Sequence, residues 1–230
     1  MPLPTVPAAT GRATPHDPLA PGRSRGEDPR MSQATLRTGR LVLAPLAERH
    51  LPHEIELDAD PEVMRHLGPP RTREEVVARH RERLAVAART PGLGFWAGHL
   101  GGANGASSGN GEEGEFVGWW ILEPPERAGH GHDRAVAEIG YRLLPRFWRR
   151  GLASEGAREL LRHGFDDLGL SRVFAETMAV NEASRATMRS IGLSHVRTFH
   201  PGWDHPLPGS EHGEVEYATT RARWLASGGR

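Results

Sequence analysis

The chain has 230 residues and a formal net charge of zero, because 29 basic residues balance 29 acidic ones. This balance gives no reason to expect a nucleic acid or an acidic membrane surface as a partner. All the basic residues are arginine, and cysteine is absent. A Schiff-base or phosphate-loop lysine, disulfides, thiolate metal sites and a cysteine acyl-enzyme are therefore excluded.

The N-terminal stretch, residues 1–33, is unlike the rest of the chain. It contains seven prolines and shows no apolar periodicity, so it buries too little apolar surface to offset the entropy of folding. It also lacks the apolar run of a secretory signal, and no apolar run in the chain approaches the ~20 residues of a membrane-spanning helix. We predict a disordered extension over 1–33, one domain over 34–226, and a soluble, cytoplasmic protein.

The first half of the domain is predicted to form one strand, three helices and two further strands. The clearest helix begins after Thr72, which forms a capping box with Glu75 ahead of an apolar stripe. The polar, glycine-rich segment 101–114 is typical of a long hairpin tip between two strands. In chain order, the predicted ranges are strand 36–43, helices 47–57, 61–67 and 72–89, and strands 93–100 and 115–122.

Strands and helices alternate in the second half of the domain. A polar loop over 123–134 leads into a strand that ends at Pro145, which cannot donate to a ladder. Elements in this order indicate an α/β (α+β) domain whose mixed, mostly antiparallel sheet is flanked by helices. The predicted ranges are strand 135–144, helix 151–168, strand 172–178, helix 181–191, and strands 195–199 and 214–220.

The turn between the strand that ends near Leu144 and the helix near Gly151 is a candidate anion site. No Ser, Thr, Asp or Asn stands at the expected N-cap near Trp148 or Arg149, so the first amides of the helix lack a side-chain acceptor. An anion would satisfy them, and the helix dipole favours one there. The alternative is an ordinary turn with water on its amides, which Glu155 favours because a first-turn acid already complements the dipole.

Two segments carry motifs in a recognisable order. The hexapeptide WRRGLA over 148–153 is similar to the pattern (Gln/Arg)-x-x-Gly-x-(Gly/Ala), with Trp148 at its first position, and the segment 181–193 fits N-x-x-S followed by G-(F/L). The first pattern resembles the signature of the GNAT superfamily of acetyl-CoA-dependent N-acetyltransferases. Together with the wider EIGYRLLPRFWRRGLASEG, the two resemble its branch of ribosomal-protein (alanine/serine) N-terminal acetyltransferases. The resemblance implies a single GNAT-like domain, acetyl-CoA as cosubstrate and an amine as acceptor.

The resemblance also implies which residues bind acetyl-CoA. The strand over 138–144 would splay from its neighbour, and the pantetheine arm would insert there like an extra strand and bond the backbone of residues 141–144. The pyrophosphate would lie on the amides of residues 149–153, with two arginines adding positive charge. Asn181 would meet the pantetheine arm, unless it is a plain N-cap, and Arg185 would reach a phosphate. The implied cofactor-binding residues are Tyr141, Arg142, Leu143, Leu144, Trp148, Arg149, Arg150, Gly151, Leu152, Ala153, Asn181 and Arg185.

The sequence departs from the family pattern at two positions. Many members have a tyrosine where this chain has Met188, and that tyrosine protonates the departing thiolate, which methionine cannot do. In the resembled branch a serine at the position of Ser184 approaches the sulfur, so Ser184 is the candidate proton donor; the alternative is a small polar residue inside a helix. Arg149 stands where glycine is frequent, and we expect it to cost little if the local backbone is helical.

Direct attack of an amine on the thioester requires a base that depends on the acceptor. An α-amine of pKa ~8 is about a tenth neutral at pH 7, whereas a lysine side chain near ~10.4 needs about 4.6 kcal/mol for deprotonation. A peptide N-terminus or a small amine is therefore the expected acceptor, with a water relay to Glu138 as the candidate base. The backbone N–H of Leu143 would face the oxyanion. Other candidate carboxylates are Asp204, Glu211, Glu214 and Glu216.

Three further expectations follow from the sequence. Prolines and glycines separate the four histidines of the stretch 195–212 (His195, His200, His205 and His212), so a substrate-lining or solvated loop is favoured there and no metal is expected. The alternative to an enzyme is a non-catalytic acyl-CoA-binding sensor, because the family's tyrosine is missing. A homodimer is compatible with the sequence.

Overall fold

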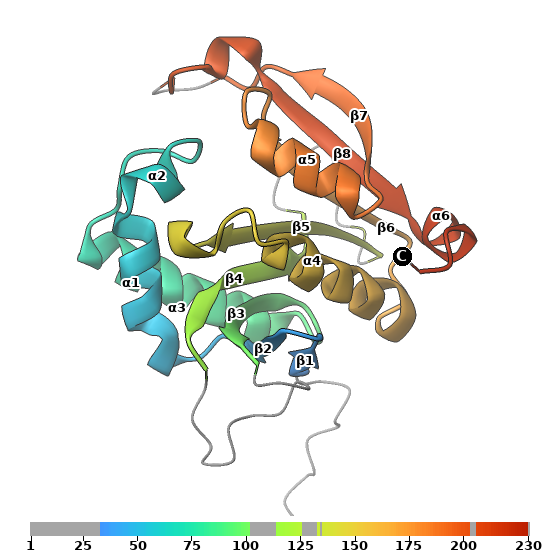
Figure 1. The fold of residues 1–230 in the computed structure, drawn as a ribbon, viewed down its shortest axis with the longest axis horizontal. Helices are drawn as coiled ribbons and strands as arrows, with labels where there is room; N and C mark the ends of the chain where they lie inside the picture. The colour runs from blue at the N-terminus through green and yellow to red at the C-terminus, as the bar shows by residue number, and fades with distance from the viewer. Residues whose placement is uncertain (1–32, 102–113, 126–132, 134, 203–205, 230) are drawn as a thin grey trace, which may run out of the picture.

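The computed structural model describes residues 33–101, 114–125, 133, 135–202 and 206–229 (Figure 1). An eight-stranded sheet runs through the domain in the order β1-β2-β3-β4-β5-β6-β8-β7. The predicted disordered extension lies outside the described residues except for Gln33, so it and the domain bounds stay predictions. The strands are β1 Leu36–Arg37, β2 Leu41–Pro45, β3 Gly94–Leu100, β4 Phe116–Glu123, β5 Val136–Leu143, β6 Arg172–Met178, β7 Ser194–Phe199 and β8 Glu214–Thr220.

The pairing of the strands confirms the mixed, mostly antiparallel sheet. All neighbours run antiparallel except β5 and β6, which run parallel. The single strand predicted over 36–43 is wrong, because a tight turn makes it a hairpin in which Leu36 of β1 faces Leu43 of β2. Leu36, Leu41 and Leu43 are all buried. Their spacing is compatible with one strand as well as with two, so the hydrophobic pattern alone does not reveal the turn.

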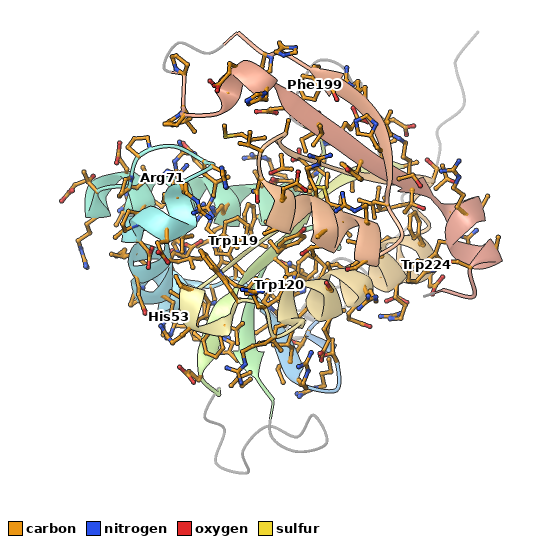
Figure 2. All side chains as sticks on the ribbon, turned by 45° about the horizontal axis from the view of Figure 1, so that its top comes forward. His53, Arg71, Trp119, Trp120, Phe199 and Trp224 are labelled. Atoms are coloured by element: carbon orange, nitrogen blue, oxygen red, sulfur yellow. The ribbon has the colours of Figure 1, made fainter. Side chains whose placement is uncertain are left out.

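Helices cover both faces of the sheet. Trp119 and Trp120 are neighbours on β4 and point to opposite faces, and Figure 2 labels both. The Trp120 indole donates to the carbonyl of Ala153 on α4 at 3.1 Å, whereas the Trp119 ring contacts Arg83 of α3. In Figure 1, α4 and α5 lie on the near face and α3 lies behind the sheet. The helices are α1 Leu51–Ala59, α2 Pro61–Met64, α3 Arg73–Arg89, α4 Leu152–Arg162, α5 Glu182–Ser190 and α6 Arg221–Ala226.

A local signal sets the start of α3, whereas the end of α4 differs from the prediction. The capping box is confirmed, since Glu75 N donates to Thr72 Oγ1 at 3.3 Å and Thr72 N donates to Glu75 Oε2 at 2.8 Å. In contrast, α4 ends at Arg162 and continues as the π-helical turn η3 (His163–Asp167), so the single helix predicted over 151–168 joins two helix types. Helix α6, capped by Thr220, was not predicted. Among the described residues, no helix combines the length and apolarity needed to cross a membrane.

Candidate active site

Strands β5 and β6 separate in the middle of the sheet. Their parallel pairing covers only the first three residues of each strand and ends at Glu138 and Phe174. Strand β5 nevertheless continues to Leu143, and β6 continues to Met178. Beyond Glu138, one edge of β5 therefore has no strand partner in the described part of the chain. An extended ligand can pair with such an edge as an added strand.

The open edge of β5 presents the backbone of Tyr141 and Leu143. Leu144 N donates to Val117 O of β4 at 3.0 Å, so Leu144 belongs to a hydrogen-bonded pair of the antiparallel ladder. Since hydrogen-bonded and non-bonded pairs alternate along such a ladder, Leu143 and Tyr141 turn their N–H and C=O groups away from β4. The backbone of Arg142 instead faces β4. Of residues 141–144, which were expected to bond the pantetheine arm through their backbone, only Tyr141 and Leu143 therefore turn their backbone groups to the open edge.

A run of unpaired backbone amides follows β5. The described residues provide no hydrogen-bond acceptor to the amides of residues 149–154, and the first bond of α4 joins Glu155 N to Gly151 O at 3.0 Å. Gly151 is the N-cap of α4, with a left-handed φ of 75° and no side-chain cap. The N-cap thus lies beyond the expected positions, Trp148 and Arg149. Unpaired amides at the N-terminus of a helix form an anion site, and we name residues 149–154 the cradle.

Arg149 has a strained backbone inside the cradle. Its φ is 57°, the one positive value among the described non-glycine residues. The left-handed region costs an L-residue about 1–2 kcal/mol, so the expectation that Arg149 is nearly free of cost in a helical backbone is wrong. Strain of this size persists where the surroundings enforce it, commonly at functional sites. The side chains of Arg149 and Arg150 are exposed beside the unpaired amides.

Glu155 lies in the first turn of α4, as the sequence suggested, but its carboxylate is engaged by the β1–β2 turn. Its carboxylate accepts hydrogen bonds from Thr38 Oγ1 at 2.5 Å and from Arg40 Nε at 2.6 Å. Arg40 Nη1 also donates to the carbonyl of Arg150 at 3.0 Å. These bonds hold the cradle against the β1–β2 turn, and the arginine neutralises the acid that would repel a phosphate. Sequence reasoning missed Thr38 and Arg40, which lie more than a hundred positions from Glu155.

Trp148 closes the open edge of β5 next to the cradle. Its indole Nε1 donates to the carbonyl of Leu143 at 2.7 Å, and a third of the side chain remains exposed. The Leu143 carbonyl is therefore already engaged, while its N–H points to the same open side. The N–H of Leu143 is thus the group available to face the oxyanion, whereas its carbonyl is already bonded to Trp148.

Helix α5 brings Ser184 to the open edge of β5. The Tyr141 hydroxyl donates to the carbonyl of Ser184 at 3.1 Å and lies 3.4 Å from its Oγ. Burial raises the pKa of Tyr141 to about 12, although hydrogen bonds with Ser184 and Thr187 act in the opposite direction. The phenol is therefore fully protonated at neutral pH. Met188, one turn further along α5, is buried in the core and has no hydroxyl group. Tyr141 of β5 places a hydroxyl group beside α5 instead.

Two predicted cofactor residues on α5 have protein partners. Asn181 Oδ1 accepts from Ser184 N at 3.2 Å and its amide donates to Thr177 Oγ1 at 3.0 Å, so it caps the helix. Arg185 Nη1 donates to the carbonyl of Ala179 at 2.8 Å. Their predicted contacts with the cofactor stay predictions.

The candidate bases lie at different distances from the open edge. Glu138 stands at its closed end and, four positions before Arg142 on β5, shares the face of that residue. Glu216 is buried on β8 and binds the guanidinium groups of Arg172 and Arg197. Glu176, missed by the sequence reasoning, follows Phe174 on the part of β6 that pairs with β8 but no longer with β5, and only 7 % of its side chain is exposed. Glu211 is exposed, Glu214 is buried, and Asp204 lies outside the described residues.

A buried ionic cluster lies on the face opposite α4. Asp58 and Glu54 of α1 have no exposed surface; Asp58 binds Arg142 and accepts from Arg71 Nη1 at 2.9 Å, and Glu54 binds Arg83 and His80. Burial opposes ionisation of Asp58, but the arginines outweigh it and lower its pKa. Burial lowers the pKa of Arg142 to about 10, so it remains charged at pH 7. The sequence does not reveal this cluster, because its members come from distant segments.

No metal centre is evident in the part of the chain that the structure describes. No group of three or more His, Asp or Glu side chains there could hold an ion. His195, His200 and His212 do not form such a group, and His205 lies outside the described residues. The expectation of no metal stays a prediction.

The family model described as "Acetyltransferase (GNAT) domain" matches residues 40–194. A relative from Aspergillus fumigatus, named "FsC-acetyl coenzyme A-N(2)-transacetylase", is 44% identical over 198 residues, which cover 84% of this chain and 79% of that protein. Both matches include the cradle, the open edge of β5 and α5.

Solved structures share the fold. The spermidine N-acetyltransferase from Vibrio cholerae in complex with CoA and spermine superposes with a TM-score of 0.63 at 12% identity, covering 82% of this chain and 99% of that one. The RimL ribosomal L7/L12 alpha-N-protein acetyltransferase in complex with coenzyme A has a TM-score of 0.61 at 19% identity, covering 80% of this chain and 95% of that one. At these identities the likeness concerns the fold alone.

Proposed function

The chain belongs to the GNAT family and is an N-acetyltransferase that uses acetyl-CoA as cosubstrate, and we propose that its acceptor is a primary α-amine of a small molecule or a peptide N-terminus. The relative that is 44% identical supports an acceptor nitrogen of the N(2) kind. The motifs over 138–155 and 181–193 support a place beside the ribosomal-protein branch. The homodimer stays a prediction.

The proposed binding mode rests on the two unpaired backbone surfaces. The amides of residues 149–154 hold the pyrophosphate, and the backbone of Tyr141 and Leu143 pairs with the pantetheine arm. Gly151 keeps the approach clear, since a Cβ built there meets only Arg40 Nη2, at 3.5 Å. This cradle is the observation that carries the cofactor assignment. It also explains why the side chains of Arg149 and Arg150 can stay exposed.

The chemistry is direct transfer. The neutral amine attacks the thioester carbonyl carbon, and the Leu143 N–H stabilises the negative charge that develops on the carbonyl oxygen. The carbon–sulfur bond then breaks. The amine releases one proton to Glu138 through water, and the Ser184 hydroxyl donates one proton to the thiolate and recovers it from solvent. An α-amine suits this arrangement because it is about a tenth neutral at pH 7 and needs no strong base.

Thiol release from acetyl-CoA tests the proposal. The acceptor panel contains an α-amino amide, a peptide with a free N-terminus, a polyamine and an N-blocked lysine. The α-amines should react with the highest kcat/KM at pH 7. Faster turnover of the polyamine or of the lysine side chain would contradict the acceptor assignment. Tight acetyl-CoA binding without turnover of any amine would favour the sensor.

A further inference from the structure

Two buried hydrogen-bond donors face each other without a partner on β4 and β5. Trp119 and Arg142 are opposite residues of the antiparallel ladder, and the guanidinium carbon of Arg142 lies 4.7 Å from the centre of the Trp119 ring. Trp119 is 6% exposed and the Arg142 side chain 9%. Trp119 Nε1 and Arg142 Nε have no hydrogen-bond partner among the described residues.

Unpaired donors of this kind are uncommon in folded proteins. Buried polar groups almost always have a hydrogen-bond partner, because a buried group without one has lost its hydrogen bonds to water and gained none in the protein. One unpaired donor is an ordinary exception. Two on adjacent stacked groups indicate that one acceptor atom is missing from their common surroundings.

The neighbouring carboxylates already have partners. Asp58 Oδ1 binds Arg142 Nη1 and Asp58 Oδ2 accepts from Arg71 at 2.9 Å. Glu54 binds both Arg83 and His80. The three guanidinium groups of Arg71, Arg83 and Arg142 thus share the two buried carboxylates of Asp58 and Glu54. The surroundings therefore favour an oxygen atom that carries partial or full negative charge.

The position of Arg142 connects this pair to the open edge of β5. Arg142 lies between Tyr141 and Leu143, whose backbones face that edge. Its side chain stacks on that of Trp119, which leaves the sheet on the face opposite the one where Trp120 contacts α4. With the cofactor on the α4 side, this opposite face is where the acceptor amine approaches the thioester.

We propose that Trp119 Nε1 and Arg142 Nε bind an oxygen atom of the acceptor, a carbonyl or carboxylate oxygen on the carbon next to the one that bears the amine. The inference rests on the proposed acetyl transfer at this edge and specifies its substrate class. An α-amine next to a carbonyl satisfies both donors. A simple alkylamine or a polyamine leaves them unpaired, which is a penalty that selects against it.

Paired acceptors test the site by turnover. Alaninamide and sec-butylamine are compared at equal concentrations of neutral amine, so that their different pKa values do not enter. Trp119→Phe keeps an aromatic side chain on β4 and removes the indole N–H; it should lower kcat/KM for alaninamide about tenfold and that for sec-butylamine less than about twofold. Arg142→Lys, which keeps the charge beside Asp58, should show the same selectivity. Trp224→Phe on the distant helix α6 is the matched control and should change neither rate. Equal losses for both amines, or none, would overturn the proposal.

Binding provides a readout that needs no turnover. In the complex with coenzyme A, the indole N–H resonance of Trp119, assigned by its loss in Trp119→Phe, should move downfield when alaninamide is added and stay in place with sec-butylamine. A resonance that does not respond to alaninamide overturns the oxygen site. If it moves while no amine releases thiol from acetyl-CoA, the oxygen site stands and the proposed transfer fails.

Discussion

Replacing Gly151 by alanine should weaken acetyl-CoA binding through a cause separate from its effect on stability. Gly151 has a φ of 75° at the N-cap of α4, and a Cβ there meets only Arg40 Nη2 at 3.5 Å, an ordinary contact. The protein therefore loses only the backbone term, about 1–2 kcal/mol for an L-residue in the left-handed region. That strain is present with and without ligand, so it cancels in the binding equilibrium.

The effect on binding comes from the space that the new methyl group occupies. It stands among the amides of residues 149–154, where the pyrophosphate must approach. A hydrogen bond to a charged group contributes about 1.5–3 kcal/mol, so the loss of one raises Kd about tenfold or more. Isothermal titration with coenzyme A measures Kd, and urea unfolding measures the free energy of unfolding.

Gly169 offers the matched control. It also has a left-handed φ, of 70°, and a Cβ there meets nothing within 4 Å. Gly169→Ala should lower the free energy of unfolding by a similar amount and leave Kd unchanged. If Gly151→Ala binds coenzyme A as tightly as Gly169→Ala does, the assignment of the cradle to the pyrophosphate is refuted.

Three further changes test other parts of the site. The pKa of Asp58 is lower in the folded than in the unfolded protein, so its ionised carboxylate stabilises the fold above the unfolded pKa, and this stabilisation is lost as pH falls through the folded pKa. Asp58→Asn should therefore be about 3 kcal/mol less stable at pH 7. Urea titrations should show that acidification lowers its free energy of unfolding less than that of the wild type. Ser184→Ala should lower kcat about a hundredfold with Kd for acetyl-CoA unchanged, and an unaltered kcat would remove Ser184 from the mechanism. Tyr141→Phe removes the hydroxyl 3.1 Å from the Ser184 carbonyl and should lower kcat about tenfold; a change in Kd alone would give Tyr141 a role in binding instead.

Features with local causes could be predicted from the sequence. The capping box of Thr72 and Glu75 formed as expected, because both partners lie within one helical turn. The strand, turn and helix around the cradle also have local signals, with Pro145 ending β5 and Gly151 beginning α4. The mixed sheet followed from the order of these elements. These signals were sufficient for the fold class and for locating the turn whose amides the structure leaves unpaired.

Features that depend on distant partners could not be predicted. The bond between Thr38 and Glu155 spans 117 positions, and the ion pair between Asp58 and Arg142 spans 84. Acids on α1 resemble a solvent-facing stripe until the fold brings arginines to them. The left-handed backbone of Arg149 was equally hidden, because arginine gives no local signal for a positive φ.

The separation of β5 from β6 has no local signal in the sequence; the family resemblance implied it, and the register confirms it. Both strands are continuous, and only the pairing register shows that they part after Glu138. The choice of Tyr141 and Leu143 over their neighbours depends in turn on a single bond, from Leu144 to Val117 on another strand. Which backbone groups are available to a cofactor is thus a property of the sheet, not of the strand.

A crystal structure of the complex with coenzyme A tests the central claim most directly. The account predicts pyrophosphate oxygens within hydrogen-bond distance of the amides of residues 149–154. It also predicts a pantetheine arm that pairs with the backbone of Tyr141 and Leu143 and leaves that of Arg142 and Leu144 bonded to β4. A coenzyme whose phosphates lie away from the cradle, or whose pantetheine avoids the open edge of β5, would contradict it.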